Sequence, residues 1–101
     1  MVHFVVQFEP KQLDQFNKEF LTDMTVSKNS IHVRDGASIG QDKKFLYVRV
    51  MGGEEKVAAA KKLFEEKKFG TILPQNEADN VSKAIEKEEE EAAEGMGALF
   101  G

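Results

Sequence analysis

Large apolar residues occupy every second position at the start of the chain. From Val2 to Phe8 this period of two predicts a β-strand with one strongly apolar face. Pro10 then suits the first turn of a helix. Apolar residues follow with helical spacing at Leu13, Phe16, Phe20 and Leu21. The pattern predicts an amphipathic helix that ends near Asp23.

The alternation returns twice in the middle of the chain. It predicts a second strand over Ile31 to Arg34 and a third over Phe45 to Val50. The glycines and polar residues of positions 35–42 are typical of a hairpin connection between them. Gly52 and Gly53 end the third strand.

A second helix is expected from Glu54 to Lys68, with Gly70 as its C-cap and residues 71–73 as a short closing strand. The order β-α-β-β-α(-β) predicts an α+β fold of the ferredoxin-like sandwich type, with both helices on one face of an antiparallel sheet. We expect residues 1–74 to form this domain.

The character of the chain changes at Gln75. Val81 and Ile85, at i and i+4, predict a helix from about Glu77 to Ala93 with a thin apolar stripe. Glu88 to Glu91 is a run of four acids, which is typical of a solvated, flexible segment. We expect residues 75–94 to be an acidic helical or flexible linker and residues 95–101 to be a hydrophobic docking motif.

Charge divides at the same point. Residues 1–74 carry a net charge of +2 and residues 75–101 a net charge of −6, which together give the −4 of the whole chain. A mildly basic body permits an anionic partner.

Several classes of function are excluded or disfavoured. The chain contains no cysteine, which excludes thiol catalysis and cysteine-based zinc sites. No apolar run is long enough to span a membrane, and the N-terminus lacks the positive region of a secretory signal, so we expect a cytoplasmic protein. His3 and His32 are too few ligands for a metal site. We expect a binding protein rather than an enzyme, with no cofactor.

The predicted sheet has a second face, opposite the helices. Its residues are His3, Val5, Gln7, His32, Arg34, Phe45, Tyr47 and Arg49. Aromatic rings beside cations suit single-stranded RNA, because rings stack on bases and cations hold phosphates. The same half-apolar face equally suits a homodimer or another protein interface, or packing beneath the chain's own tail.

The third strand resembles a signature of the RNA-recognition motif family. Four residues stand where that family has the same type: Lys43, Phe45, Tyr47 and Val48. Lys44 and Leu46 replace small residues, and Val50 replaces an aromatic. The resemblance implies RNA binding through Phe45 and Tyr47.

The sequence ends in three large apolar residues behind the acidic run: Met96, Leu99 and Phe100. Their spacing places them on one face of a single helical turn, as in short segments that dock into a groove on a partner. Gly95 and Gly97 weaken an isolated helix, so we expect this segment to be disordered when free and to fold on binding. The alternative is that Leu99 and Phe100 tuck back onto the body.

This ending resembles that of the archaeal ribosomal stalk proteins, which finish with a Glu/Ala-rich stretch and Gly-Leu-(Gly/Ser)-Ala-Leu-Phe-Gly. The resemblance covers residues 88–101, with Met96 in place of the first leucine. It implies that Met96, Leu99 and Phe100 recruit translational GTPases. The rest of the chain does not follow that family, whose members begin with a helical dimerisation domain.

Three hypotheses follow for the function. The first is a translation- or ribosome-associated archaeal protein whose tail recruits, or competes for, translation factors that are GTPases. The second is a self-associating, homodimeric module, ribosome-binding or structural, that uses the open sheet face. The third is a single-stranded RNA-binding module.

Overall fold

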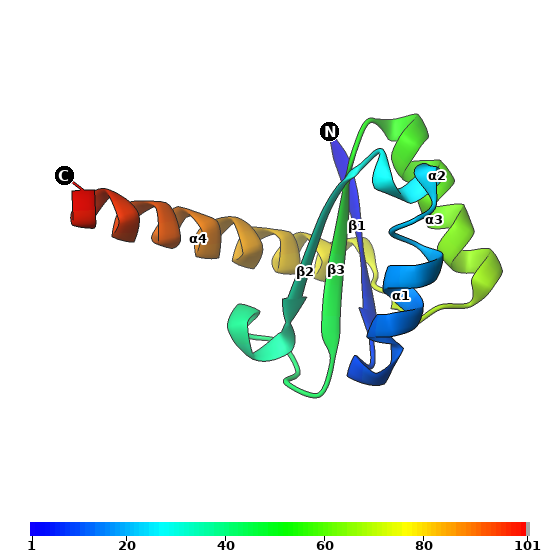
Figure 1. The fold of residues 1–101 in the computed structure, drawn as a ribbon, viewed down its shortest axis with the longest axis horizontal. Coiled ribbons are helices and arrows are strands. Elements are labelled where there is room, and N and C mark those ends of the chain that lie inside the picture. Colours follow the sequence, from blue (N-terminus) through cyan, green and yellow to red (C-terminus); the bar gives the residue numbers. More distant parts are fainter. Residues whose placement is uncertain (101) are drawn as a thin grey trace.

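The computed structural model describes the backbone of residues 1–100 and the side chains of residues 1–92. Its elements are, in chain order, β1 (Val2–Phe8), the 3₁₀ helix η1 (Pro10–Gln12), α1 (Leu13–Glu19), α2 (Met24–Ser27), β2 (Ser30–Asp35), the 3₁₀ helix η2 (Gly36–Ile39), β3 (Leu46–Gly52), α3 (Glu54–Lys67), β4 (Thr71–Ile72) and α4 (Gln75–Phe100). The predicted α+β class is confirmed (Figure 1).

The four strands form one antiparallel sheet in the order β2-β3-β1-β4. β1 pairs with β3 over its whole length, from Val2 opposite Gly52 to Phe8 opposite Leu46. β2 is a free edge strand on the far side of β3, and the two-residue β4 lies beside β1 at the other edge. All strands lie within two residues of their predicted positions at either end.

Helices α1, α2 and α3 cover one face of the sheet (Figure 1). The core beneath them consists of Phe4, Val6, Phe8, Phe16, Phe20, Val26, Val48, Val50, Val57, Ala60, Phe64 and Phe69. Six of these are phenylalanines in mutual contact, and the rings of Phe20 and Phe64 stack with centroids 4.2 Å apart. Alternation predicts seven strand residues that face the helices. Four of them lie in this core (Phe4, Val6, Val48 and Val50), and the other three pack at its margin (Ile31, Val33 and Leu46).

Helix α4 lies on the opposite face, so helices cover both faces of the sheet and not one alone (Figure 1). Ala78, Val81 and Ile85 are buried against Val5 and Tyr47 in a second apolar cluster. The first part of the segment predicted as a linker is therefore packed on the body. The end of α4 projects away from the sheet, and the longest dimension of the molecule is 47 Å.

The helix predicted from Pro10 to Asp23 is broken into shorter pieces. α1 ends at Glu19, and Leu21, the last member of the predicted stripe, is 37% exposed. Asp23 begins a new helix instead of ending the first one, because its carboxylate accepts a hydrogen bond from the backbone N–H of Thr25 at 2.8 Å. The four-residue α2 that it caps was not predicted.

The C-cap of α3 also differs from the prediction. Lys68, not Gly70, occupies the left-handed cap position, with φ 51°. Gly70 has φ 59° and lies so close to β1 that a Cβ there would be 2.5 Å from the carbonyl oxygen of Gln7. Glycine is required at residue 70 for the approach of the chain to the sheet rather than for the helix cap.

Candidate binding surface between α4 and the sheet

The sheet face predicted to carry function lies under and beside α4. Val5, Tyr47 and Arg49 are buried there, with at most 2% of each residue exposed. His3, Gln7, His32, Arg34 and Phe45 are half-buried. The structure therefore brings all eight predicted residues to one face, and of the three alternatives for that face it places the chain's own helix over its centre.

We call the contact surface between α4 and the sheet the seam. Its centre is apolar. Ala78, Val81 and Ile85 project from successive turns of α4 onto Val5, Tyr47 and Ile39. Burying a valine or isoleucine side chain contributes about 1.5–3 kcal/mol, so these few residues hold the base of the helix. The thin apolar stripe predicted for the tail is the stripe that docks.

Arg49 lies beneath the next turn of α4, with 1% of its surface exposed. Its Nη1 donates to Ser82 Oγ at 2.8 Å and lies 3.4 Å from the Glu86 carboxylate. Its Nη2 lies 3.3 Å from Nδ1 of His32. Its Nε has no hydrogen-bond partner among the described residues. A buried cation with one unsatisfied donor makes this part of the seam costly to keep closed.

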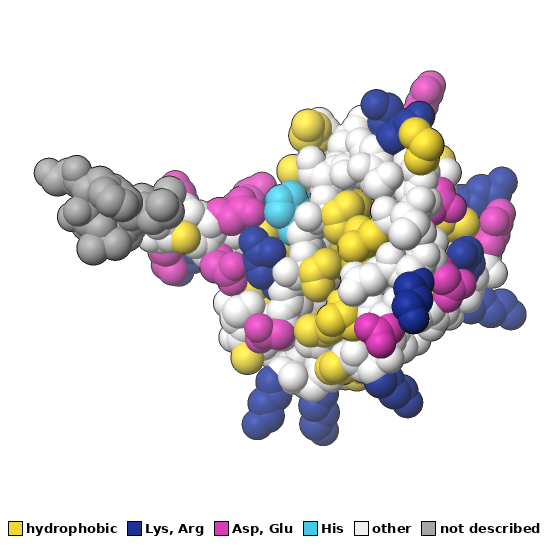
Figure 2. All heavy atoms as spheres, viewed as in Figure 1, with side chains coloured by type: hydrophobic (Ala, Val, Ile, Leu, Met, Phe, Trp, Pro, Cys, Tyr) yellow, Lys and Arg dark blue, Asp and Glu magenta, His cyan; other side chains and the backbone are white. Residues whose placement is uncertain are grey.

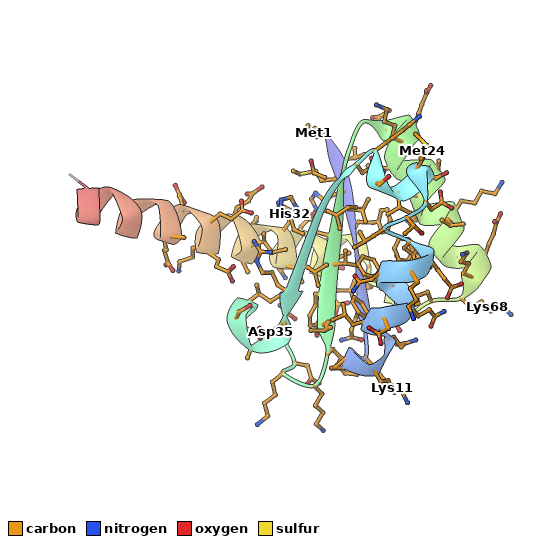
Figure 3. All side chains as sticks on the ribbon, in the orientation of Figure 1. Met1, Lys11, Met24, His32, Asp35 and Lys68 are labelled. Atoms are coloured by element: carbon orange, nitrogen blue, oxygen red, sulfur yellow. The ribbon has the colours of Figure 1, made fainter. Side chains whose placement is uncertain are left out.

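The imidazole of His32 accepts at Nδ1, because a guanidinium has donors and no acceptor. Burial is the largest cause that lowers the pKa of His32 below its ordinary value of 6.5, and the charge of Arg49 lowers it further. Glu89, whose carboxylate lies 3.6 Å from Nε2, opposes this shift. Figure 3 shows His32 on the side of β2 that faces α4.

Arg34 closes the seam at the edge strand β2. Its Nε donates to Glu88 at 2.7 Å, and its Nη2 lies 3.4 Å from Glu89. Figure 2 shows acidic side chains of α4 gathered beside a histidine and basic side chains where the helix leaves the body. Half of the acidic run expected to be solvated is thus paired with the sheet.

A third polar contact lies near the start of α4. Asp79 Oδ1 is 3.0 Å from His3 Nε2 and accepts a hydrogen bond from Gln75 Nε2 at 2.8 Å. The hydrogen bond from Gln75 is the largest cause that lowers the pKa of Asp79. Both predicted histidines therefore face an acid of α4.

Sequence reasoning missed the helix side of this surface. The residues concerned are Asp79, Ser82, Glu86, Glu88 and Glu89. Asp79, Ser82, Glu86 and Glu89 recur at i, i+3, i+7 and i+10, so the spacing on a helix was a signal that they share one face. Nothing in the sequence indicated which strand that face would meet.

The sheet face continues beyond α4 into an open end around Phe45. A hollow of about 360 Å³ is lined by Gln7, Phe8, Glu9, Lys11, Gln12, Phe45, Gly70 and Thr71. An adjoining hollow of about 310 Å³ is lined by Glu9, Pro10, Lys11, Lys44 and Phe45. Tyr47 borders this end through its hydroxyl, which accepts from Gln7 Nε2 at 2.9 Å. Phe45 thus stands between two lysine-bearing hollows.

The remaining predicted site lies outside the described side chains. The docking residues Met96, Leu99 and Phe100 belong to the part of α4 of which only the backbone is described. Within the described residues no group of three or more His, Cys, Asp or Glu side chains could hold a metal ion. Over the same residues, no helix has both the length and the apolar character needed to cross a membrane.

Comparisons with family models, with curated proteins and with solved structures find no match to this chain.

Proposed function

We propose that this chain is a translation-associated binding protein that presents a hydrophobic docking segment at the end of α4 to translation factors, chiefly GTPases. The proposal combines the stalk-like ending of residues 88–101 with the course of α4 (Figure 1). In this proposal the α+β body holds the protein at its site of attachment, and the projecting part of α4, which we call the arm, carries the docking segment. The chemistry is binding, without a catalytic step.

The observation that carries the proposal is that, among the described side chains, those of α4 that are buried against the sheet or paired with it lie between Ala78 and Glu89. Ala78, Val81 and Ile85 are buried, and the last contact with the sheet that involves a charged pair is made by Glu89. From there α4 continues to Phe100, about 16 Å at the usual helical rise. The backbone of α4 beyond Glu89 projects away from the sheet (Figure 1), and in this proposal a partner reaches the docking segment there.

The two acids that follow the paired residues of α4 also support the docking function. Glu90 and Glu91 are exposed and make no ion pair within the described residues. Their charge keeps an apolar ending in solution and steers it toward basic surfaces. One apolar turn gives modest affinity, about micromolar, which attachment of the body to a ribosome would raise through effective concentration.

We also propose a ferredoxin-like classification for the body. The strand order β2-β3-β1-β4, with α1 and α3 on one face, supports it. The insertion of α2 and the cover provided by α4 are additions to that plan.

The experiment that tests the docking function compares two single variants of the full chain. Phe100→Ala should weaken binding to an archaeal elongation-factor GTPase by about tenfold or more, since a docking anchor is lost. Met24→Ala, which removes an apolar side chain that is 68% exposed on the far side of the body, is the matched control. Equal affinities for Phe100→Ala, Met24→Ala and the unaltered chain would refute the docking role.

A second candidate function is single-stranded RNA binding at the open end of the sheet. It is favoured by one observation, the position of Phe45 between the two hollows that Lys11 and Lys44 line. A base can stack on the half-buried ring while lysines hold its phosphates. Phe45→Ala should lower affinity for an oligouridine. The double variant Lys11→Gln/Lys44→Gln should make the affinity for the oligouridine less dependent on salt concentration than the control Lys61→Gln/Lys62→Gln on α3 does.

The homodimeric alternative is less well supported. It used the sheet face as the interface, and Tyr47, at the centre of that face, is 2% exposed beneath α4. Self-association through this face requires α4 to leave it.

A further inference from the structure

We propose that the sheet face beneath α4 is itself a binding surface for single-stranded RNA, and that the acidic side chains of α4 occupy it as an intramolecular competitor. The inference rests on the second candidate function and adds its regulation. It concerns the cationic row under the helix, whereas the open end around Phe45 is accessible without any movement.

The row consists of cations supplied by two neighbouring strands. Arg34 comes from β2 and Arg49 from β3, and His32 lies opposite Arg49 in the register of those strands. Each arginine meets an acid of α4: Arg34 meets Glu88 at 2.7 Å and Arg49 meets Glu86 at 3.4 Å. The carboxylates stand at the positions where phosphate oxygens of a bound strand would satisfy the same guanidinium groups.

Two aromatic rings continue the row, from Tyr47 of β3 to Phe45, which directly precedes that strand. Phe45, Tyr47 and Arg49 alternate on the same face, about 7 Å apart from one to the next. This spacing leaves room for successive bases to stack on the rings while the arginines take phosphates. An acidic peptide would use the arginines alone, so the rings favour a nucleic acid as the partner.

The contact between α4 and Arg49 leaves part of the hydrogen-bonding capacity of this arginine unused. Arg49 is 1% exposed, yet its Nε has no partner, and Glu86 reaches it only at 3.4 Å while staying 62% exposed. A helix that evolved only as a permanent cover would be expected to bury an apolar side chain here or to satisfy every donor. The unsatisfied donor is available to a ligand that replaces the helix.

The attachment of α4 allows such replacement. The helix follows Leu73 and Pro74 directly, and none of the described side chains of α4 belongs to the core under α1, α2 and α3. Release of α4 would break the second apolar cluster, in which Val81 and Ile85 cover Val5 and Tyr47, while the core under α1, α2 and α3 stays intact. Because RNA and α4 then compete for one face, weakening the helix contacts raises the apparent affinity for RNA in proportion to the fraction of open molecules.

The test uses two double variants of the full chain with the same change in charge. Glu88→Gln/Glu89→Gln removes the acids that contact Arg34, and Glu90→Gln/Glu91→Gln removes two neighbouring acids that make no ion pair among the described residues. Affinity for an oligouridine of about ten nucleotides is measured by fluorescence anisotropy. Amide hydrogen exchange of α4 is followed with and without the oligonucleotide, and thermal unfolding checks that both variants are folded.

We expect Glu88→Gln/Glu89→Gln to bind about threefold to tenfold more tightly than Glu90→Gln/Glu91→Gln, and amides near Ser82 to lose protection when RNA is added. Equal affinities of the two variants, with protection of α4 unchanged by RNA, would overturn the competition. If RNA then still binds and Phe45→Ala weakens it, the open-end site stands without this regulation. If no variant binds RNA, both the open-end RNA site and the competition by α4 are overturned. If an acidic peptide binds more tightly than RNA, the choice of RNA as the partner is overturned.

Discussion

Arg34 of β2 and Glu88 of α4, 54 positions apart in the sequence, meet with Nε and Oε1 2.7 Å apart. Together with the burial of Val81 and Ile85, this contact determines how α4 crosses the sheet, with its base over β1 and its acidic turn over β2. The helix is thereby both a cover for the sheet and an arm that leaves it. The proposed functions follow from these two roles.

A double-mutant cycle on Arg34→Gln and Glu88→Gln measures the worth of that contact. Both side chains are partly exposed, so we expect a coupling of about 0.5–1 kcal/mol that shrinks as salt is added. The more loosely placed pair of Lys67 and Glu19, 3.5 Å apart, should couple more weakly and serves as the control. Zero coupling of Arg34 with Glu88 at low salt would show that this crossing is not fixed by charge.

Substitutions of Ser82 and of Arg49 should lower the stability of the fold by different amounts. Ser82→Ala removes the shortest hydrogen bond of the buried Arg49 and leaves its Nη1 only the 3.4 Å contacts with the Ser82 carbonyl oxygen and Glu86, so it should lower the free energy of unfolding by about 1–3 kcal/mol. Arg49→Met removes the buried charge and keeps the volume, so its effect should be smaller. Urea unfolding of the two variants checks the order, and a larger loss for Arg49→Met would contradict the description of this seam.

Stability should fall as the solution is acidified below neutral pH. The pKa of His32 is lowered in the folded chain, so the unfolded chain takes up a proton first, near the ordinary value of 6.5. The stabilisation is complete above that pH and is lost as pH falls through it, and the lowered pKa of Asp79 acts in the same direction below its ordinary 3.8. Unfolding at about pH 7.5 and about pH 5.5 measures the loss. His32→Gln should reduce the difference, and an unchanged difference would assign it to other groups.

Two residues after α3 should respond in opposite ways to substitution. Lys68 has φ 51°, so Lys68→Gly relieves a strained cap and should stabilise the fold by up to about 1 kcal/mol. Gly70→Ala places a Cβ 2.5 Å from the Gln7 carbonyl oxygen at φ 59° and should destabilise it. Thermal unfolding distinguishes the two, and the same sign of shift for both would refute this assignment of the cap.

The strands were predictable because their signal is local. Alternation from Val2 to Phe8 and from Phe45 to Val50 specifies both the strand and the face that packs beneath α1, α2 and α3, without knowledge of the partners. The break at Asp23 was not predictable from the apolar stripe. An aspartate is common both in the loop that follows a helix and at the N-cap of the next helix, and the sequence pattern did not distinguish the two.

Only the sheet side of the site could be predicted from the sequence. Period-two alternation placed His32, Arg34 and Arg49 on one face, but the acids that meet them lie in another element far along the chain. A thin stripe such as Val81 and Ile85 fits a helix packed on its own sheet and a helix packed on a partner equally well. Which of these occurs depends on the complementary shape and charge of two surfaces, and this information is not contained in either segment alone.

The most direct test is a proton–nitrogen NMR titration of the full-length labelled protein with an archaeal elongation-factor GTPase. We predict that amide signals of residues 95–101 shift or broaden, while those of Val81, Ser82 and Ile85 stay in place, because the arm binds and its base remains anchored. Shifts confined to the body, or none at all, would contradict the proposal that the end of α4 is the docking segment.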